Sequence, residues 1–365
     1  MYLLRSTALS TLSLQGLGFT PFFRQSLAQL GDSLIPARVA VAHRGLWVCL
    51  TPDGERTARL PGRLRHAAQD ARALPAVGDW VALTAGPAPD DPAAIAAVLP
   101  RATALVRQAA GRATAPQVLA ANVDTVFIVT SANADFSPAR LQRYRAAVTS
   151  GGAEPVVVLN KADLATPDDL VALRARVPRG LRVVTTSALD GAGVDDLGAE
   201  LVPGATVALV GSSGVGKSTL VNRLLGEARL ATSQVRDSDE TGRHTTTHRE
   251  LVALPSGALL IDTPGIRELA LWVGDEDPDE ADFIGVLARS CRFADCTHAG
   301  EPGCAVRAAV AAGELAAEEL ADHERLAREA AWQRRRQDPT AAREHDRAFR
   351  KLVREHQAIM KNKRR

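Results

Sequence analysis

Short apolar runs alternate with amphipathic stretches through the middle of the chain. Helical stretches such as SPARLQRYRAAVTSG (137–151) and KSTLVNRLLGEA (217–228) separate five continuously apolar runs: VFIVTS (126–131), PVVVLN (155–160), LRVVTTS (181–187), TVALVG (206–211) and ALLIDTPG (258–265). Strands that are apolar along their whole length are buried on both faces, and strands separated by helices are typical of a parallel sheet. The pattern predicts a multidomain α/β protein whose central domain has a mostly parallel sheet with helices on both faces.

The region before this domain has a different texture. Glycine and proline punctuate five short segments with strand character: ARVAVAH (37–43), LWVCLT (46–51), RTARL (56–60), DWVALT (79–84) and IAAVLP (95–100). About five short strands in so few residues are typical of a small closed barrel such as an oligonucleotide-binding (OB) fold. A small β domain without any ligand is the alternative that this pattern leaves open.

Composition indicates a soluble protein with more than one domain. The chain has 365 residues, of which 46% are hydrophobic and 24% charged. No apolar run approaches the length of a transmembrane helix, and the N-terminus lacks a cleavage site for export, so we expect a cytoplasmic protein with no membrane partner. The net charge is +2, but the charge is unevenly distributed: residues 332–365 form a basic tail with 12 Lys+Arg against 4 Asp+Glu. That tail can follow a phosphate backbone or be an ordinary solvated face.

One apolar run leads into a phosphate-binding motif. The stretch GSSGVGKS (211–218) has the spacing G-x-x-x-x-G-K-S between a predicted strand and a predicted helix. Backbone N–H groups of such a loop surround phosphates at the positive end of the helix. Lys217 is expected to reach the β- and γ-phosphates, Ser218 to bind Mg²⁺, and Asp262 in DTPG to hold Mg²⁺, with an N–H from Gly265 near the γ-phosphate. The predicted phosphate site comprises Gly211, Ser212, Ser213, Gly214, Val215, Gly216, Lys217, Ser218 and Thr219.

A second motif points to guanine. In NKAD, Asp163 can accept both donors on the guanine edge, N1–H and the exocyclic amine, whereas adenine offers no such pair and leaves the carboxylate unpaired. Lys161 can lie against the purine face, and Asn160 can tie this loop to the phosphate loop. In TSAL (186–189), which supplies Ser187, the Ala188 N–H can meet the guanine O6. An ATP-dependent enzyme is the alternative, and Asp163 argues against it.

The two motifs occur in the reverse of their usual order, because the base motif precedes the phosphate loop. The termini of a compact domain often lie close together, so joining them and opening the chain elsewhere preserves the site. A circularly permuted GTPase domain is the simplest explanation.

A cysteine cluster follows the central domain. CRFADCTHAGEPGC has the spacing C-x4-C-x-H-x5-C, from Cys291 through Cys296 and His298 to Cys304. Three thiolates and one imidazole suit a closed, structural Zn²⁺ site. The fourth cysteine, Cys49, lies in a predicted barrel strand and is expected in the core.

Together these motifs resemble the RsgA (YjeQ/EngC) family of circularly permuted, ribosome-associated GTPases. The resemblance covers roughly residues 16–320 and also includes LGFTPFF, PAVGDWV, QVLAANVDTVFIVTS, TGRHTTTHREL and DTPGIREL. It implies an OB-fold barrel, the permuted P-loop GTPase domain and a helical zinc-binding domain. We expect these boundaries: a partly disordered segment 1–35, a barrel 36–105, the GTPase domain 106–283, and a zinc-binding domain with a basic tail 284–365.

The resemblance also implies a function. It predicts a monomer that binds GTP and GDP, contacts rRNA of the small ribosomal subunit during late maturation, and hydrolyses GTP when that subunit stimulates it. TGRHTTT (241–247) corresponds to the first switch, in which Thr245, Thr246 or Thr247 senses Mg²⁺ and the γ-phosphate; we assign Thr246. His244 resembles the residue proposed to complete the catalytic site. Ile266 occupies the position where many GTPases have a glutamine that orients the attacking water. The alternative function is therefore a GTP-regulated RNA-binding assembly factor with negligible catalytic turnover.

Overall fold

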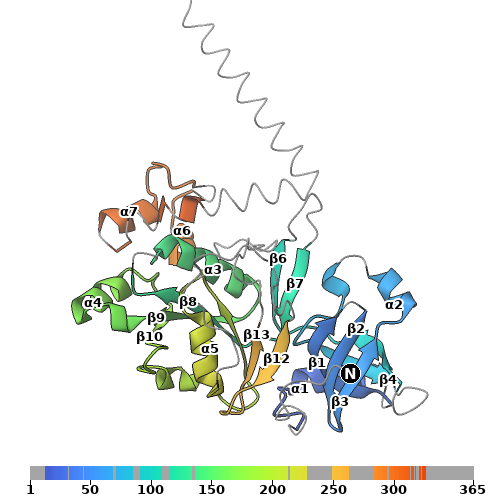
Figure 1. Cartoon of the computed structure of the whole chain (residues 1–365). Coiled ribbons are helices and arrows are strands. Elements are labelled where there is room, and N and C mark those ends of the chain that lie inside the picture. Colours follow the sequence, from blue (N-terminus) through green and yellow to red (C-terminus); the bar gives the residue numbers. More distant parts are fainter. Residues whose placement is uncertain are drawn as a thin grey trace, which may run out of the picture. The chain divides into compact units, whose positions relative to one another are not determined.

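This computed structural model forms two compact units, one within residues 1–272 and the other within residues 273–365 (Figure 1). The structure describes all residues of the chain except 1–12, 32, 44, 69–70, 85–90, 109–115, 134–135, 213, 228–248, 263–282, 294–295, 313, 316, 318–319, 322 and 326–365. The predictions for the first twelve residues and for the basic tail therefore stay predictions.

A short helix, α1 (Pro21–Ala28), and a five-stranded barrel open the first unit. The barrel strands are β1 (Ile35–His43), β2 (Leu46–Thr51), β3 (Gly54–Arg59), β4 (Trp80–Thr84) and β5 (Ala93–Val98). Strand β1 pairs with both β2 and β4, β3 pairs with β2 and β5, and β5 pairs with β4, so the sheet closes on itself. The predicted barrel is confirmed. Helices α2 (Gly62–Ala67) and η2 (Ala71–Ala73) lie between β3 and β4.

Alternating positions on these strands fill the barrel. Side chains two residues apart point to the same face of a strand, and the buried set follows that spacing, for example Ala37 and Val39 on β1 and Val81 and Leu83 on β4. Cys49 belongs to this core and is fully buried, as predicted. Burial raises the pKa of its thiol to about 12.

An antiparallel pair of strands, which the hydrophobic pattern does not predict, follows the barrel. These strands are β6 (Ala104–Gln108) and β7 (Pro116–Ala121). They lie in the sequence between the barrel and the first strand of the parallel sheet.

The rest of the first unit is the predicted α/β arrangement. Its sheet has the order β10-β9-β8-β11-β13-β12, with β12 antiparallel to its neighbour and the other strands parallel. The strands are β8 (Thr125–Ser131), β9 (Glu154–Asn160), β10 (Arg182–Thr185), β11 (Thr206–Val210), β12 (Glu250–Ala253) and β13 (Leu259–Asp262). The helices are α3 (Pro138–Ser150), η3 (Ala162–Leu164), α4 (Pro167–Ala175), η4 (Asp195–Ala199) and α5 (Lys217–Leu225).

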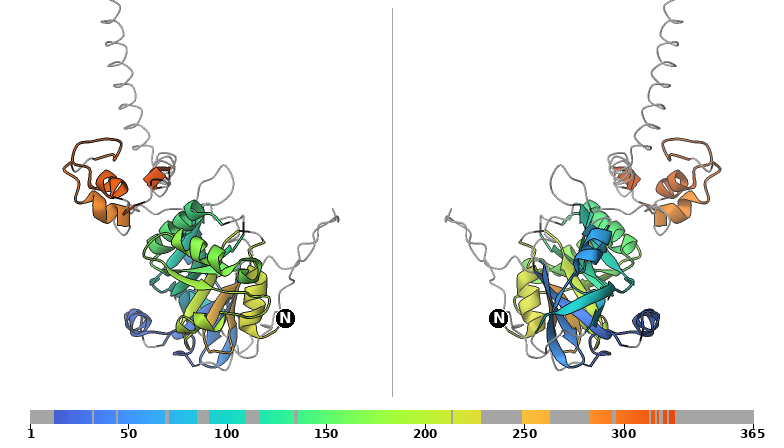
Figure 2. Two further views of the ribbon diagram at one scale, coloured as in Figure 1. Left: turned by 90° about the vertical axis from the view of Figure 1, so that its left-hand side faces the viewer. Right: turned by 90° about the vertical axis from the view of Figure 1, so that its right-hand side faces the viewer.

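Helices cover both faces of this sheet. Val126 and Ile128 on β8 share one apolar cluster with Leu141 of α3, whereas Phe127 between them shares a second cluster with Leu220 of α5. Figure 2 shows the green helix α3 and the yellow helix α5 on different sides of the strands. Because the central strands β8 and β11 are buried on two faces, their sequences are apolar along most of their length rather than alternating.

The barrel and the parallel sheet are continuous through one strand pairing. Val41 of β1 pairs with Glu250 of β12, and Glu250 also lies opposite Asp262 of β13, which gives a single sheet of eleven strands. Arg38 strengthens this junction, because its buried guanidinium donates to the carbonyl oxygens of Leu17, Gly78 and Asn122 and to the Thr206 hydroxyl. Burial lowers the pKa of Arg38 to about 10, so it remains charged at neutral pH.

The second unit has its own small core. Its described helices, α6 (Phe283–Ala288) and α7 (Ala305–Ala311), pack through Ile284, Val306 and Ala309, together with Leu315 and Leu320. Among the helices that the structure describes in either unit, none has the length and apolarity needed to span a bilayer.

Candidate active site and metal centre

The phosphate loop connects the carboxyl end of β11 to the first residue of α5. Gly211 and Gly216 have φ angles of 144° and 94°, and a Cβ atom on them would overlap the Val129 carbonyl oxygen and the Asn160 side-chain amide, respectively. Only glycine fits both the backbone and the space there. The N–H groups at the start of α5 have no acceptor within the helix itself, which makes this helix terminus next to the loop an anion site. Of the nine predicted loop residues, Ser213 lies outside the described residues.

Lys217 folds back over this loop. Its Nζ donates to the carbonyl oxygens of Gly211, at 2.8 Å, and Ser212, at 2.5 Å. Ser218 and Thr219 follow in the first turn of α5. The ammonium group thus lies over the loop whose N–H groups can hold an anion.

Asn160 joins the base motif to the phosphate loop. Its side chain is 1% exposed, and its Nδ2 donates to the Val215 carbonyl oxygen at 2.9 Å. Its Oδ1 accepts hydrogen bonds from the Thr186 hydroxyl at 3.1 Å and from the Ala188 N–H at 3.0 Å. Segments that are far apart in the sequence therefore meet at one buried amide, as the permuted arrangement requires.

The residues predicted to read the base lie beside this amide. Asp163 is exposed on η3, and its Oδ1 accepts a 2.7 Å hydrogen bond from the hydroxyl of buried Ser187. Lys161 adopts a left-handed conformation, with φ 61°, directly after β9. The Ala188 N–H, predicted to meet guanine O6, is directed at Asn160, so a bound base has to share that hydrogen or take it over.

Sequence reasoning missed two side-chain contacts to the phosphate loop. Arg140 Nη1 on α3 donates to Ser212 Oγ at 2.5 Å, and the Tyr144 side chain, one turn later, also hydrogen bonds Ser212. Burial raises the pKa of Tyr144, so its phenol stays neutral. A further contact that the sequence did not predict involves the TSAL loop: Arg223 of α5 donates to the carbonyl oxygens of Ala188 and Leu189. The periodicity of α3 predicts a helix but not which of its polar residues reaches a loop seventy residues away.

The switch residues predicted to act on the γ-phosphate lie outside the described residues. These are His244, Thr245, Thr246, Thr247, Gly265 and Ile266. Asp262 is the last residue of β13, which runs parallel to β11 with Ala208 opposite Ile261. Parallel strands end at the same edge of a sheet, so the backbone of Asp262 lies at the edge that carries the phosphate loop.

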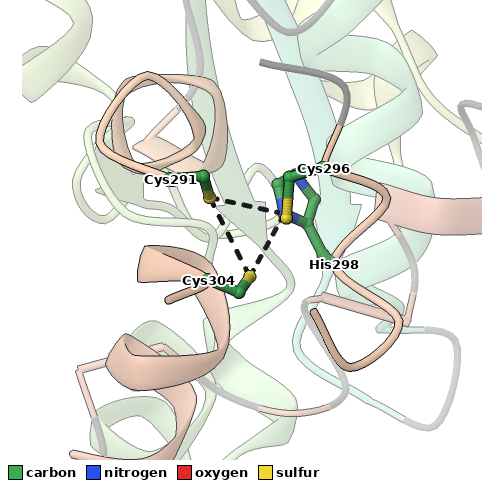
Figure 3. A group of neighbouring side chains, drawn as sticks. All are labelled: Cys291, Cys296, His298 and Cys304. Carbon is green, nitrogen blue, oxygen red and sulfur yellow. Dashed lines mark hydrogen bonds between the residues drawn. The ribbon is translucent and has the colours of Figure 1, made fainter. Parts of the chain in front are cut away.

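The second unit brings the four predicted metal ligands together (Figure 3). Cys291 Sγ lies 3.9 Å from Cys304 Sγ, and His298 Nδ1 lies 3.7 Å and 3.4 Å from these two sulfurs. Tetrahedral Zn²⁺, with bonds of about 2.3 Å to sulfur and 2.0 Å to nitrogen, requires S–S separations of about 3.8 Å and S–N separations of about 3.5 Å. The three separations among Cys291, His298 and Cys304 fit this geometry, and the ligand atom of Cys296 lies within 4.8 Å of the other three.

Local hydrogen bonds favour a thiolate in this cluster. Burial is the largest single influence on the pKa of Cys291 and raises it. Hydrogen bonds from the N–H groups of Val306 and Ala305 at the start of α7 and from the Cys296 and Cys304 side chains together outweigh burial and lower the pKa below its usual value. Cys304 caps the same helix by accepting from the Arg307 N–H. Arg307 Nε in turn donates to the His298 carbonyl oxygen at 2.8 Å, which holds the histidine loop in place.

Comparison with known proteins gives consistent results along most of the chain. The RsgA GTPase family model matches residues 98–272. The small ribosomal subunit biogenesis GTPase RsgA of Opitutus terrae is 50% identical over 349 residues, covering 92% of this chain and 95% of that protein. The small ribosomal subunit biogenesis GTPase RsgA 2 of Lactiplantibacillus plantarum is 46% identical, covering 88% and 91%.

Two solved structures share the fold. YjeQ from Thermotoga maritima superposes with a TM-score of 0.62 at 26% identity, over 81% of this chain and 98% of that one. YloQ, described as a circularly permuted GTPase, gives a TM-score of 0.58 at 25% identity, over 81% and 95%.

Proposed function

The chain belongs to the RsgA GTPase family, and on this premise we propose that it hydrolyses GTP to GDP and phosphate during late maturation of the small ribosomal subunit, which stimulates it. One observation carries the proposal beyond the resemblance. The Asn160 Nδ2 hydrogen bond to the Val215 carbonyl oxygen, at 2.9 Å, unites the base motif and the phosphate loop in one site. A nucleotide can bridge these two loops only if they are neighbours.

We assign the phosphates to the loop from Gly211 to Thr219. Its N–H groups and the Lys217 ammonium supply positive charge where charge develops during phosphoryl transfer. Ser218, Asp262 and Thr246 are the residues proposed to hold Mg²⁺, and their oxygen donors suit that ion. When bound, Mg²⁺ neutralises phosphate charge.

Guanine selection is assigned to Asp163 together with Lys161, Ser187 and Ala188. The Ser187 hydroxyl donates to one carboxylate oxygen of Asp163, which orients the carboxylate and leaves lone pairs for the guanine N1–H and amine. Adenine lacks this pair of donors, so binding it would desolvate the carboxylate without compensation. The site therefore favours GTP and GDP over adenine nucleotides.

The hydrolytic step needs a group that orients water. Ile266 has no polar atom for that task, and His244 in the first switch is the proposed substitute. His244→Ala should keep the affinity for GTP, because the phosphate loop and Asp163 are intact, but lose the subunit-stimulated rate. Phosphate release under single-turnover conditions measures this, and an unchanged stimulated rate would remove His244 from the mechanism.

The other modules are proposed to serve binding and stability. The Cys291, Cys296, His298 and Cys304 donors are assigned to one structural Zn²⁺, which would cross-link the second unit. The barrel and the basic residues of 332–365 are the proposed rRNA contacts. We propose that the protein acts in the cytoplasm as a monomer on the subunit.

GTP turnover with and without purified small ribosomal subunits tests the function. We expect slow turnover alone and strong stimulation by small subunits, with large subunits at equal RNA concentration as the control. Tight, GTP-dependent binding to small subunits without any stimulation would instead identify a GTP-regulated RNA-binding assembly factor.

A further inference from the structure

One arginine on the phosphate-loop helix reaches across to the base loop. Arg223 of α5 donates through Nε to the Ala188 carbonyl oxygen at 3.3 Å and through Nη2 to the Leu189 carbonyl oxygen at 2.5 Å. A planar guanidinium donates from separate nitrogens that are held in a fixed geometry, whereas the three donors of an ammonium share one nitrogen that rotates freely. The two carbonyl groups belong to consecutive residues of the TSAL loop.

The backbone of Ala188 is consequently held from two sides. Its N–H donates to Asn160, which ends β9, and its carbonyl oxygen accepts from Arg223 on α5. Ala188 is 3% exposed and belongs to the same apolar cluster as Leu220 and Val221 of α5. The loop is thus docked onto the helix by packing and by Arg223 together.

The same loop controls the carboxylate that reads the base. Ser187 precedes Ala188 and donates to Asp163 Oδ1, so any displacement of the loop changes the support of that carboxylate. Asp190 lies two residues after Ala188, and its pKa is lowered first by a hydrogen bond from the Ala192 N–H, with a smaller contribution from the charge of Arg223. The cationic side chain of Arg223 therefore lies near one carboxylate of this loop, that of Asp190, which favours its charge.

We infer that Arg223 is a positioning residue for guanine recognition, which fixes the TSAL loop to the helix that begins at the phosphate loop. The inference rests on the proposed function, since it assigns Asp163 and Ala188 to the base. Helix α5 starts at Lys217, so Arg223 lies fewer than two turns from the phosphate loop. A rigid helix then sets the distance between the phosphate half and the base half of the site.

The chain offers a matched control for this role. Arg174 of α4 is also exposed and also donates to two acceptors, the Thr185 hydroxyl at 2.9 Å and the Val183 carbonyl oxygen at 3.4 Å. These acceptors lie on β10, before the loop, rather than in it. Loss of Arg174 removes the same kind of contact without releasing the TSAL loop.

The experiment compares Arg223→Ala, Arg223→Lys and Arg174→Ala with the unaltered full chain. Affinities for GDP and for Mg-pyrophosphate are measured by competition against a fluorescent GDP analogue. GDP engages both halves of the site, whereas pyrophosphate engages the phosphate loop alone. The thermal midpoint of each variant shows that it is folded, and GTP turnover with small subunits gives KM and kcat separately.

Arg223→Ala should weaken GDP binding by about 3- to 10-fold, the worth of one or two partly exposed hydrogen bonds. Pyrophosphate affinity and kcat should be unchanged, KM should rise with the GDP Kd, and Arg223→Lys should recover part of the loss. Arg174→Ala should bind both ligands normally. Unchanged GDP affinity in Arg223→Ala, or an equal loss for pyrophosphate, would overturn the inference. If the unaltered protein itself failed to bind GDP, the proposed function would fall first.

Discussion

Replacing Asn160 with alanine should damage both the fold and nucleotide binding. The amide makes three hydrogen bonds, to the Val215 carbonyl oxygen, the Thr186 hydroxyl and the Ala188 N–H. Thr186 and Val215 are 0% and 2% exposed, so water cannot replace the lost partner. At about 1 kcal/mol net for each hydrogen bond, the free energy of unfolding should fall by about 3 kcal/mol.

Thermal unfolding with and without GDP measures both effects. For a unit of this size about 1 kcal/mol corresponds to about 2 °C, so the midpoint should fall by about 6 °C. GDP at 100 times its Kd should raise the midpoint of the unaltered protein by about 5 °C, from about 2.7 kcal/mol of linkage. The same GDP concentration should stabilise Asn160→Ala much less, because the base and phosphate loops are no longer joined.

Asn133→Ala provides the control, because Asn133 is exposed at the same edge of the sheet and accepts a hydrogen bond from Ser131. Ser131 is 1% exposed, so its hydroxyl loses one partner that solvent does not replace, and the midpoint should fall by about 2 °C. The GDP shift should stay close to that of the unaltered protein, because this hydrogen bond lies in neither the base loop nor the phosphate loop. A midpoint within 1 °C of the unaltered protein for Asn160→Ala, with an undiminished GDP shift, would refute the role assigned to the amide.

Three further outcomes are expected. Arg101→Ala removes the guanidinium that makes a bidentate ion pair with the fully buried Asp79 carboxylate. The free energy of unfolding should fall by about 3–5 kcal/mol at neutral pH. Burial raises the pKa of Asp79, so this deficit should shrink as the pH falls from 7.5 to 4.5; a pH-independent deficit in urea titrations would contradict it. Cys49 should resist iodoacetamide at pH 8 until the protein unfolds, as mass spectrometry can show, and rapid labelling of the native protein would refute its burial. Cys296→Ser should lose zinc and make the second unit sensitive to protease without changing GDP affinity; full zinc occupancy would exclude Cys296 as a ligand.

Local sequence signals were sufficient for the elements that carry the site. The glycine spacing from Gly211 to Gly216 follows from close backbone approaches that the structure shows, and the buried parallel strands are apolar throughout because both faces are covered. The four residues of the cysteine cluster converge as their spacing predicted. In each case the signal lies within a few consecutive residues.

Contacts between distant segments were not predictable in this way. The pairing of Val41 with Glu250 joins the barrel to the parallel sheet, but the sequence of neither strand indicates which strand it pairs with. Arg140 and Arg223 touch the two loops of the site, yet arginine supplies 39 of the 44 basic residues once the five lysines are subtracted. An abundant residue type gives no reason to single out two of its members, and only the folded backbone does so.

A structure of the protein crystallised with Mg²⁺ and a non-hydrolysable GTP analogue is the decisive measurement for the single permuted site. We predict the guanine edge on the Asp163 carboxylate and the β- and γ-phosphates within the loop from Gly211 to Thr219, under Lys217. A nucleotide bound at the loop with its base turned away from Asp163, or bound elsewhere on the chain, would contradict the arrangement from which the GTPase mechanism follows.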